Sequence, residues 1–185
     1  GDELVVRIGA AAPLTGPQAH IGKDNENGTR MAIEDANAKG VTIGGRKARF
    51  ELLSEDDQTD NRVATIVAQK LVDAQVKGVV GHLNSGASIP ASKIYHDAGI
   101  PQISPSATAI KYTDQGFKTA FRTMTNDRQQ GRVLGEFLVK KMGGKRVAIV
   151  DDRTAYGQGL ADEVGKAVKA SGGELVAREY TSDKA

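Results

Sequence analysis

The chain has 185 residues, of which 39% are hydrophobic and 26% are charged, and its 25 basic residues nearly balance its 23 acidic ones. This composition is typical of an ordinary globular protein, and the formal net charge of +2 favours neither nucleic acid nor a membrane surface as a partner. The sequence contains no cysteine, which excludes disulfides and thiol catalysis. Its three histidines have no spacing typical of metal ligands, so we expect neither a metal nor another cofactor.

The sequence also predicts no membrane anchor. Its apolar runs all fall short of the ~20 residues that a membrane-spanning helix needs. The first residues, GDELVVRIG, lack the basic segment and the long apolar run of a secretory signal. We therefore expect Gly1 to begin a mature or trimmed chain.

Short apolar runs alternate with helical patterns over the first part of the chain. Strands are predicted at residues 4–13, 48–56, 77–82 and 100–104, and helices at 27–40, 60–76 and 88–99. Gly40 is the expected stop of the first helix, and Asp60 is the expected N-cap of the second. Strands that alternate with helices through short connections predict a parallel sheet with helices on both faces. The predicted fold class is therefore α/β, with three α/β/α layers.

The pattern restarts beyond residue 121. Asp127 is expected to cap a helix that runs through Lys141, and a strand at 145–152, a helix at 156–173 and a strand from 174 follow. These elements open a second α/β unit but are too few to cover its sheet. We therefore predict two domains: residues 1–121 form an N-terminal α/β ligand-binding lobe, and residues 122–185 begin a second lobe that is truncated.

Three motifs that carry chemistry in other proteins are weak in this sequence. Ser85 lies outside any G-x-S-x-G pattern and has no histidine or acid at a spacing that indicates catalysis. GQGLAD begins like a dinucleotide fingerprint, but Asp162 stands where a third small residue is needed. The acids SEDD (54–57) either bind magnesium at a strand end or form a solvated loop that also caps the next helix, and we favour the loop.

Two loops rich in small hydroxyl residues follow neighbouring predicted strands. Residues 81–88, GHLNSGAS, lead into a helix that is expected to begin near Ser88, with Pro90 in its first turn. Backbone N–H groups and the helix dipole favour an anion such as a carboxylate there, unless Ser85 or Ser88 serves only as a helix cap. Residues 104–109, SPSATA, present a second such loop at the next strand end. Two adjacent loops of this kind suit one small polar ligand.

Four stretches of the sequence resemble the periplasmic leucine/isoleucine/valine-binding proteins, which are substrate-binding subunits of branched-chain amino-acid ABC importers. They are AAPLTGPQAHIGKDNENGTRMAIEDANAKG, GVVGHLNSGASIPASKIYHDAGIPQISPSATA, FRT and RVAIVDDRTAYGQGLADEV. The resemblance runs almost from end to end but covers only about the first half of a typical member. It implies the type I periplasmic-binding-protein fold, a periplasmic location and a non-catalytic function.

The resemblance also implies roles for individual residues. Ser85 matches the serine that binds the α-carboxylate of the ligand. Ser106, Ala107 and Thr108 lie in the stretch that binds the carboxylate and the ammonium group through backbone and hydroxyl groups. Tyr156 matches a tyrosine by which the second lobe closes on the ligand.

Two further residues depart from the family pattern. Ile21 replaces a tyrosine that is common in the first loop, and an apolar residue there favours an aliphatic ligand. Asn84, with Thr59, stands where the family often carries a disulfide. Both Asn84 and Ile21 are among the expected ligand-binding residues.

We therefore expect a solute-binding protein that captures a small, branched-chain aliphatic amino acid and delivers it to an ABC permease in the membrane. A sensor or receptor module of the same fold is the alternative. A hydrolase that uses Ser85 is favoured least, because the sequence pairs no base with this serine.

The 185-residue chain alone is expected to bind amino acids weakly or not at all, because it holds only half of a cleft. It is also expected to self-associate, since an unfinished lobe exposes apolar surface and unpaired strand edges. The expected surfaces are the helix faces around Val133, Phe137 and Val164 and the strand edges at 147–150 and 175–180.

Overall fold

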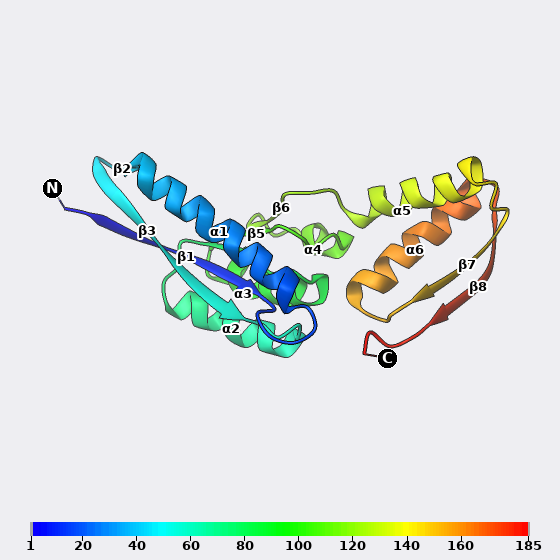
Figure 1. Cartoon of the computed structure of the whole chain (residues 1–185), viewed down its shortest axis with the longest axis horizontal. Coiled ribbons are helices and arrows are strands. Elements are labelled where there is room, and N and C mark those ends of the chain that lie inside the picture. Colours follow the sequence, from blue (N-terminus) through cyan, green and yellow to red (C-terminus); the bar gives the residue numbers. More distant parts are fainter. Residues whose placement is uncertain (1, 185) are drawn as a thin grey trace. The chain divides into compact units, whose positions relative to one another are not determined.

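The computed structural model describes residues 2–184, which form two compact units (Figure 1). The first unit holds the residues up to Ala107 together with Tyr112–Thr123, and the second holds Thr108–Lys111 together with the residues from Met124 onward. Each unit is built around its own sheet.

A six-stranded sheet forms the centre of the first unit, in the order β2-β3-β1-β4-β5-β6. Its strands are β1 (Leu4–Ala12), β2 (Thr42–Ile43), β3 (Arg46–Asp56), β4 (Gly78–Gly81), β5 (Gln102–Ser104) and β6 (Ala120–Arg122). All neighbouring strands are parallel, as predicted, except that β2 and β3 form a short antiparallel hairpin. The hairpin was not predicted. Its turn consists of Gly44 and Gly45, both with positive φ values, as a two-residue turn of this kind requires.

Helices cover both faces of this sheet. They are α1 (Ala19–Lys39), α2 (Asn61–Asp73) and α3 (Ser85–Asp97), followed by the short α4 (Ile110–Asp114). Successive residues of a strand point to opposite faces. Ala11 of β1 and Val79 of β4 pack in the main core with residues of α2 and α3, whereas Ala10 and Val80 line a small cavity beneath α1. The predicted three-layer arrangement is therefore confirmed for this unit.

Helix α1 begins well before its predicted start at residue 27. Its first turns approach the preceding loop so closely that a Cβ on Gly22 would lie 1.7 Å from the carbonyl oxygen of Pro13. The fully buried residues of α1 are Gly22 and Thr29, and Met31 is exposed. Because this helix is buried through small and polar residues, apolar periodicity did not reveal its first turns.

The predicted ends of two helices are confirmed. Gly40 ends α1 in the left-handed conformation, and the Asp60 carboxylate accepts hydrogen bonds from the backbone N–H groups of Arg62 and Val63 as the N-cap of α2. The apolar spacing of α2 would place Ile66 with the buried Val67 and Leu71, but the side chain of Ile66 is exposed.

The second unit contains a two-stranded parallel sheet and two packed helices. Its elements are α5 (Asp127–Glu136), which continues into the π-helical turn η1 (Phe137–Lys141), then β7 (Arg146–Asp151), α6 (Ala155–Ala170) and β8 (Glu174–Tyr180). The N-cap of α5 is Asn126 rather than the predicted Asp127, because the Asn126 side chain accepts from the N–H groups of Arg128 and Gln129. Val164, which we expected to be exposed, is buried on α6.

Two glycines allow α5 to lie directly against α6. A Cβ on Gly131 would lie 2.4 Å from the Cβ of Glu163, and a Cβ on Gly135 would lie 2.4 Å from the Cβ of Ala167. The helices therefore meet through backbone and small side chains. Of the larger apolar residues of α5 and η1, Val133, Leu134 and Phe137 are exposed, whereas Leu138 and Val139 are partly buried.

We expect Gly135→Ala to lower the free energy of unfolding by about 1–3 kcal/mol, because the added methyl group overpacks this contact by more than the gain in helix propensity. Gly159→Ala is the matched control, since no atom outside its own helix lies within 4 Å of a Cβ there and its φ is not positive. The control should be stabilised by about 0.5–1 kcal/mol. Urea unfolding followed by circular dichroism measures both, and equal effects of the two substitutions would contradict the packing argument.

Candidate functional site

The carboxyl ends of β1, β3, β4 and β5 meet at one edge of the sheet, because these strands are parallel. Ligands of open α/β sheets bind outside this edge. The loops that follow these strands include both hydroxyl-rich stretches that the sequence singled out.

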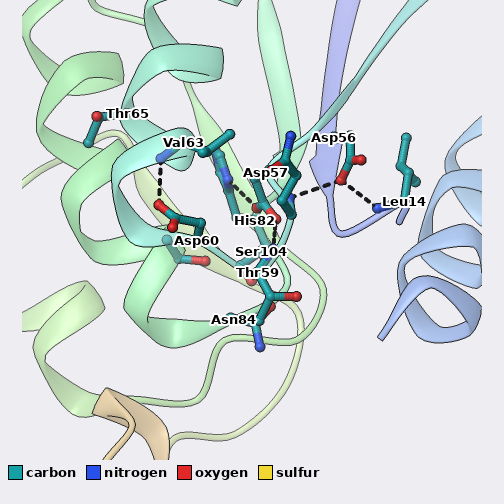
Figure 2. A network of polar contacts seen from close by, with 12 residues as sticks. Leu14, Asp56, Asp57, Thr59, Asp60, Val63, Thr65, His82, Asn84 and Ser104 are labelled. Carbon is teal, nitrogen blue, oxygen red and sulfur yellow. Dashed lines mark hydrogen bonds and ion pairs between the residues drawn. The ribbon is translucent and has the colours of Figure 1, made fainter. Parts of the chain in front are cut away.

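A fully buried polar network lies under this edge (Figure 2). Nδ1 of His82 is 2.8 Å from Oδ2 of Asp57, and Nε2 of His82 is 2.9 Å from the Tyr95 hydroxyl. All three residues have an exposed fraction of 0%. The network joins the loop after β3, the loop after β4 and helix α3, so it ties three separate segments together.

One arrangement of protons satisfies every member of this network. Asp57 accepts from the backbone N–H of Thr59 at Oδ1, 3.1 Å away, and from Nδ1–H of His82 at Oδ2. Nε2 of His82 then accepts from the Tyr95 hydroxyl, since a ring protonated at Nδ1 has its free lone pair there. Burial, followed by the nearby charge of Asp57, raises the pKa of Tyr95 far above its usual value, so this tyrosine remains a donor.

The backbone of His82 is joined to the loop after β5 (Figure 2). The hydroxyl of Ser104, which is buried, donates to the carbonyl oxygen of His82 at 2.6 Å. The hydroxyl oxygen of Ser104 in turn accepts from the backbone N–H groups of Ala107 and Ser106, at 2.8 and 3.2 Å. Ser104 thus holds the two hydroxyl-rich loops together.

The acids of SEDD are anchors rather than the solvated loop that we favoured. Asp56 accepts from the backbone N–H of Leu14 at 2.8 Å and from the hydroxyl of Thr15 at 2.6 Å, and so holds the loop after β1. Partial burial alone would raise the pKa of Asp56, but the hydrogen bonds from Thr15, Leu14 and Gln58 outweigh it and hold the pKa below its usual value. Asp57 is fully buried in the network with His82.

Helix α3 starts at Ser85, earlier than predicted. Asn84 occupies the N-cap position, so neither Ser85 nor Ser88 is the N-cap residue, and Pro90 lies beyond the first turn. The carbonyl of Asn84 accepts from the N–H groups of Ala87 and Ser88. Ser85 and Gly86 are the first two residues of the helix.

Asn84 links two loops at this edge. Its side-chain amide nitrogen donates to the side-chain oxygen of Gln18, which is the N-cap residue of α1, at 2.9 Å. The loop after β4 is thereby joined to the loop after β1. Asn84 and Thr59, where the resemblance implies a disulfide, both lie beside the buried network in Figure 2.

The structure places four of the seven predicted site residues at this edge of the first unit. Asn84 and Ser85 begin α3, and Ser106 and Ala107 lie in the loop that Ser104 holds. Ile21, also in the first unit, lies in the first turn of α1 and is exposed.

The other two predicted residues belong to the second unit. The carbonyl oxygen of Thr108 accepts from the backbone N–H of Asp127 at 2.8 Å. Tyr156 is the second residue of α6, and its side chain is exposed.

Sequence reasoning missed Gln18, Asp57, His82, Tyr95 and Ser104. One signal was available, since Asp57 and His82 each directly follow a strand of the sheet. A carboxylate and an imidazole at the ends of two strands near each other in a parallel sheet are candidates for a buried pair.

The described residues were also compared with the requirements of a metal site and of a membrane-spanning helix. In residues 2–184, no three His, Cys, Asp or Glu side chains form a group able to hold a metal ion. None of the described helices combines the length and the apolar character required to cross a membrane.

Comparison with known proteins finds relatives that are solute-binding proteins. A Leu-, Ile-, Val-, Thr- and Ala-binding protein of Pseudomonas aeruginosa is 41% identical over 167 residues, which are 90% of this chain and 44% of the relative. The isoleucine complex of LivJ, a branched-chain amino-acid transporter substrate-binding protein of Streptococcus pneumoniae, matches 98% of this chain and 51% of its own, with 30% identity and a TM-score of 0.84. A benzoate complex of a solute-binding protein from R. palustris matches 98% of this chain and 49% of its own, with 26% identity and a TM-score of 0.85.

The chain spans about half the length of the relatives that it matches. The fold is that of the type I periplasmic binding proteins, as predicted. A model of the periplasmic binding protein family matches residues 5–185. The chain therefore belongs to the periplasmic binding protein family.

Proposed function

We propose that this protein is an extracytoplasmic solute-binding protein that captures a small, branched-chain aliphatic amino acid for import by an ABC permease. The observation that carries the proposal is the start of α3 at the sheet edge, where the buried Ser85 follows β4 and the loop with Ser106 and Ala107 is tied alongside. The names of the relatives support the class of ligand.

A carboxylate is the group that the start of α3 suits best. The first N–H groups of a helix and its dipole favour a negative charge, and the Ser85 side chain is 2% exposed at this point. The ligands in the structures of the two relatives, isoleucine and benzoate, share only a carboxylate among their polar groups. We assign the carboxylate to Ser85.

The other predicted site residues receive roles of their own. Because Ser104 already accepts from the N–H groups of Ser106 and Ala107, the groups that Ser106 offers a ligand are its carbonyl and hydroxyl. We assign to Thr108 and Tyr156 the roles that the family resemblance implies. Ile21 supplies apolar surface, and burial of one methylene group against such surface is worth about 0.8 kcal/mol.

Catalysis by Ser85 has little support. The histidine nearest to it in sequence, His82, has both ring nitrogens engaged, one with Asp57 and one with Tyr95, and its side chain is fully buried. This histidine is therefore not available as the base that a serine nucleophile requires. A sensor module of the same fold would use the same binding site, so it differs in partner rather than in ligand.

A second part of the proposal concerns how the 185-residue chain behaves when it is isolated. We infer that this chain self-associates, since it exposes apolar side chains of the second unit and leaves β7 paired only with β8 among the described strands.

Calorimetric titration of the full-length protein tests the function. We expect isoleucine, leucine or valine to bind more tightly than aspartate, glutamate or lysine. Benzoate is a useful comparison because it carries the carboxylate without the ammonium group. Preference for a charged side chain, or binding of no amino acid, would contradict the proposal.

Ser85→Ala in the full-length protein is expected to weaken binding of the preferred amino acid about ten- to a hundredfold, because a hydrogen bond to a charged group contributes ~1.5–3 kcal/mol. Ser88→Ala is the matched control, since this serine lies in the same helix, is equally buried, and its hydroxyl has no hydrogen-bond partner among the described residues. Titration of both variants measures the difference, and unchanged affinity in Ser85→Ala would rule out the carboxylate assignment.

A further inference from the structure

One hydroxyl group joins the loop after β5 to the loop after β4. Ser104 ends β5 with an exposed fraction of 0%, and its oxygen makes three hydrogen bonds, to the carbonyl of His82 and from the N–H groups of Ser106 and Ala107. We propose that Ser104 is a positioning residue, which sets the backbone of residues 105–107 relative to the start of α3. This inference rests on the proposed function, because it concerns the site where that ligand would bind.

The partner of Ser104 is itself immobilised. The His82 ring is held from two sides, by Asp57 after β3 and by Tyr95 on α3, at 2.8 and 2.9 Å. A ring fixed at both nitrogens leaves the His82 backbone little freedom. The carbonyl that accepts from Ser104 is therefore a rigid anchor, three positions before Ser85 in the chain.

The loop has a second anchor on its other side. Nη1 of Arg122 in β6 donates to the carbonyl oxygen of Ala107 at 2.5 Å. With Ser104 holding the N–H of Ala107 and Arg122 holding its carbonyl, both polar groups of this residue are occupied. The peptide groups on either side of Ala107 are thereby fixed, and with them the carbonyl of Ser106.

Loss of the Ser104 hydroxyl would release this loop. Three polar groups would lose their partner, namely the carbonyl of His82 and the N–H groups of Ser106 and Ala107. A ligand would then have to order the loop as it binds. This ordering costs free energy and lowers the affinity, although every group that contacts the ligand is still present. Misplacement of such groups by as little as about 1 Å can be strongly unfavourable.

Ser92 provides a matched control. It is also buried in the first unit, and its hydroxyl also makes hydrogen bonds, to the carbonyl of Ile89 at 2.5 Å and from the Gln115 side chain at 2.9 Å. It lies in the middle of α3 and holds neither of the two loops. Ser92→Ala should therefore destabilise the fold as Ser104→Ala does, without an effect on the ligand.

The test compares Ser104→Ala and Ser92→Ala in the full-length protein, with L-isoleucine and L-leucine as the probes. We expect similar losses of urea midpoint in both variants, whereas only Ser104→Ala weakens binding, by about tenfold or more. Hydrogen exchange should be accelerated at the amides of Ser106 and Ala107 in Ser104→Ala alone. If Ser104→Ala does not fold, Ser104→Cys, which keeps the size and weakens the hydrogen bonds, should show the same differences to a lesser degree.

The outcomes separate the two proposals. Wild-type protein that binds no amino acid would overturn the proposed function. Wild-type protein that binds, together with a Ser104→Ala variant of equal affinity, would overturn only the positioning role. Equal losses of affinity in Ser104→Ala and Ser92→Ala would overturn it as well, because the effect would then follow stability alone.

Discussion

Replacement of His82 by alanine is expected to lower the free energy of unfolding by about 3–5 kcal/mol, which is a large part of the stability of a typical domain. The substitution leaves the carboxylate of Asp57 buried without its partner and the hydroxyl of Tyr95 without an acceptor. It also opens a cavity, since His82 is among the largest fully buried side chains. Urea unfolding of the first unit, followed by circular dichroism, measures the loss.

Two other variants make this result specific. His20→Ala removes an exposed histidine at the start of α1 and should change stability by less than about 0.5 kcal/mol. Tyr95→Phe removes only the hydroxyl that donates to Nε2 of His82 and should cost about 1–2 kcal/mol. An unpaired buried polar group costs about 1–3 kcal/mol. If the free energy of unfolding of His82→Ala lies within about 1 kcal/mol of the wild-type value, the network does not stabilise the fold.

Most strands of the sheet and two helix ends could be predicted, because they depend on residues that are close together in the sequence. Short apolar runs marked β1, β3, β4 and β5, and the residues Asp60 and Gly40 marked helix ends through contacts within a few positions of themselves. The early start of α1 was not predicted, because Gly22 packs against the backbone of Pro13 and such a contact produces no apolar pattern in the sequence.

The candidate site was predictable only in part. Ser85 and Ser106 could be named from two hydroxyl-rich loops at strand ends. The groups that hold these loops could not, because Asp57 meets His82 across 25 positions and His82 meets Ser104 across 22. Contacts at such separations depend on the order of strands in the sheet. The sequence shows each polar residue but not which other residue it meets.

The second unit of the 185-residue chain has, in its described part, exposed apolar surface beside an unpaired strand edge. This unit exposes Phe137 at 53% and Val150 at 64%, and an open groove of about 350 Å³ lies along β7 and α6, with Ile149 and Leu160 in its lining. Within the described residues β7 has one paired edge, toward β8. Apolar surface next to an unpaired strand edge favours association, either by addition of a strand or by exchange of segments between copies.

We therefore expect light scattering on this chain to show dimers or larger species whose fraction rises with concentration, and calorimetry to show no micromolar affinity for leucine or isoleucine. We expect weak affinity because the chain spans about half the length of the relatives that it matches. A ligand held by so short a chain stays in contact with water, and an ammonium group that is buried without a partner is costly. Val133→Glu with Phe137→Lys should reduce association, since both residues are exposed on α5 and η1 and both changes add charge to that surface. The control is Met31→Glu, which places a charge on an apolar residue of the first unit that is even more exposed. A stable monomer that binds these amino acids with micromolar or tighter affinity would contradict both expectations.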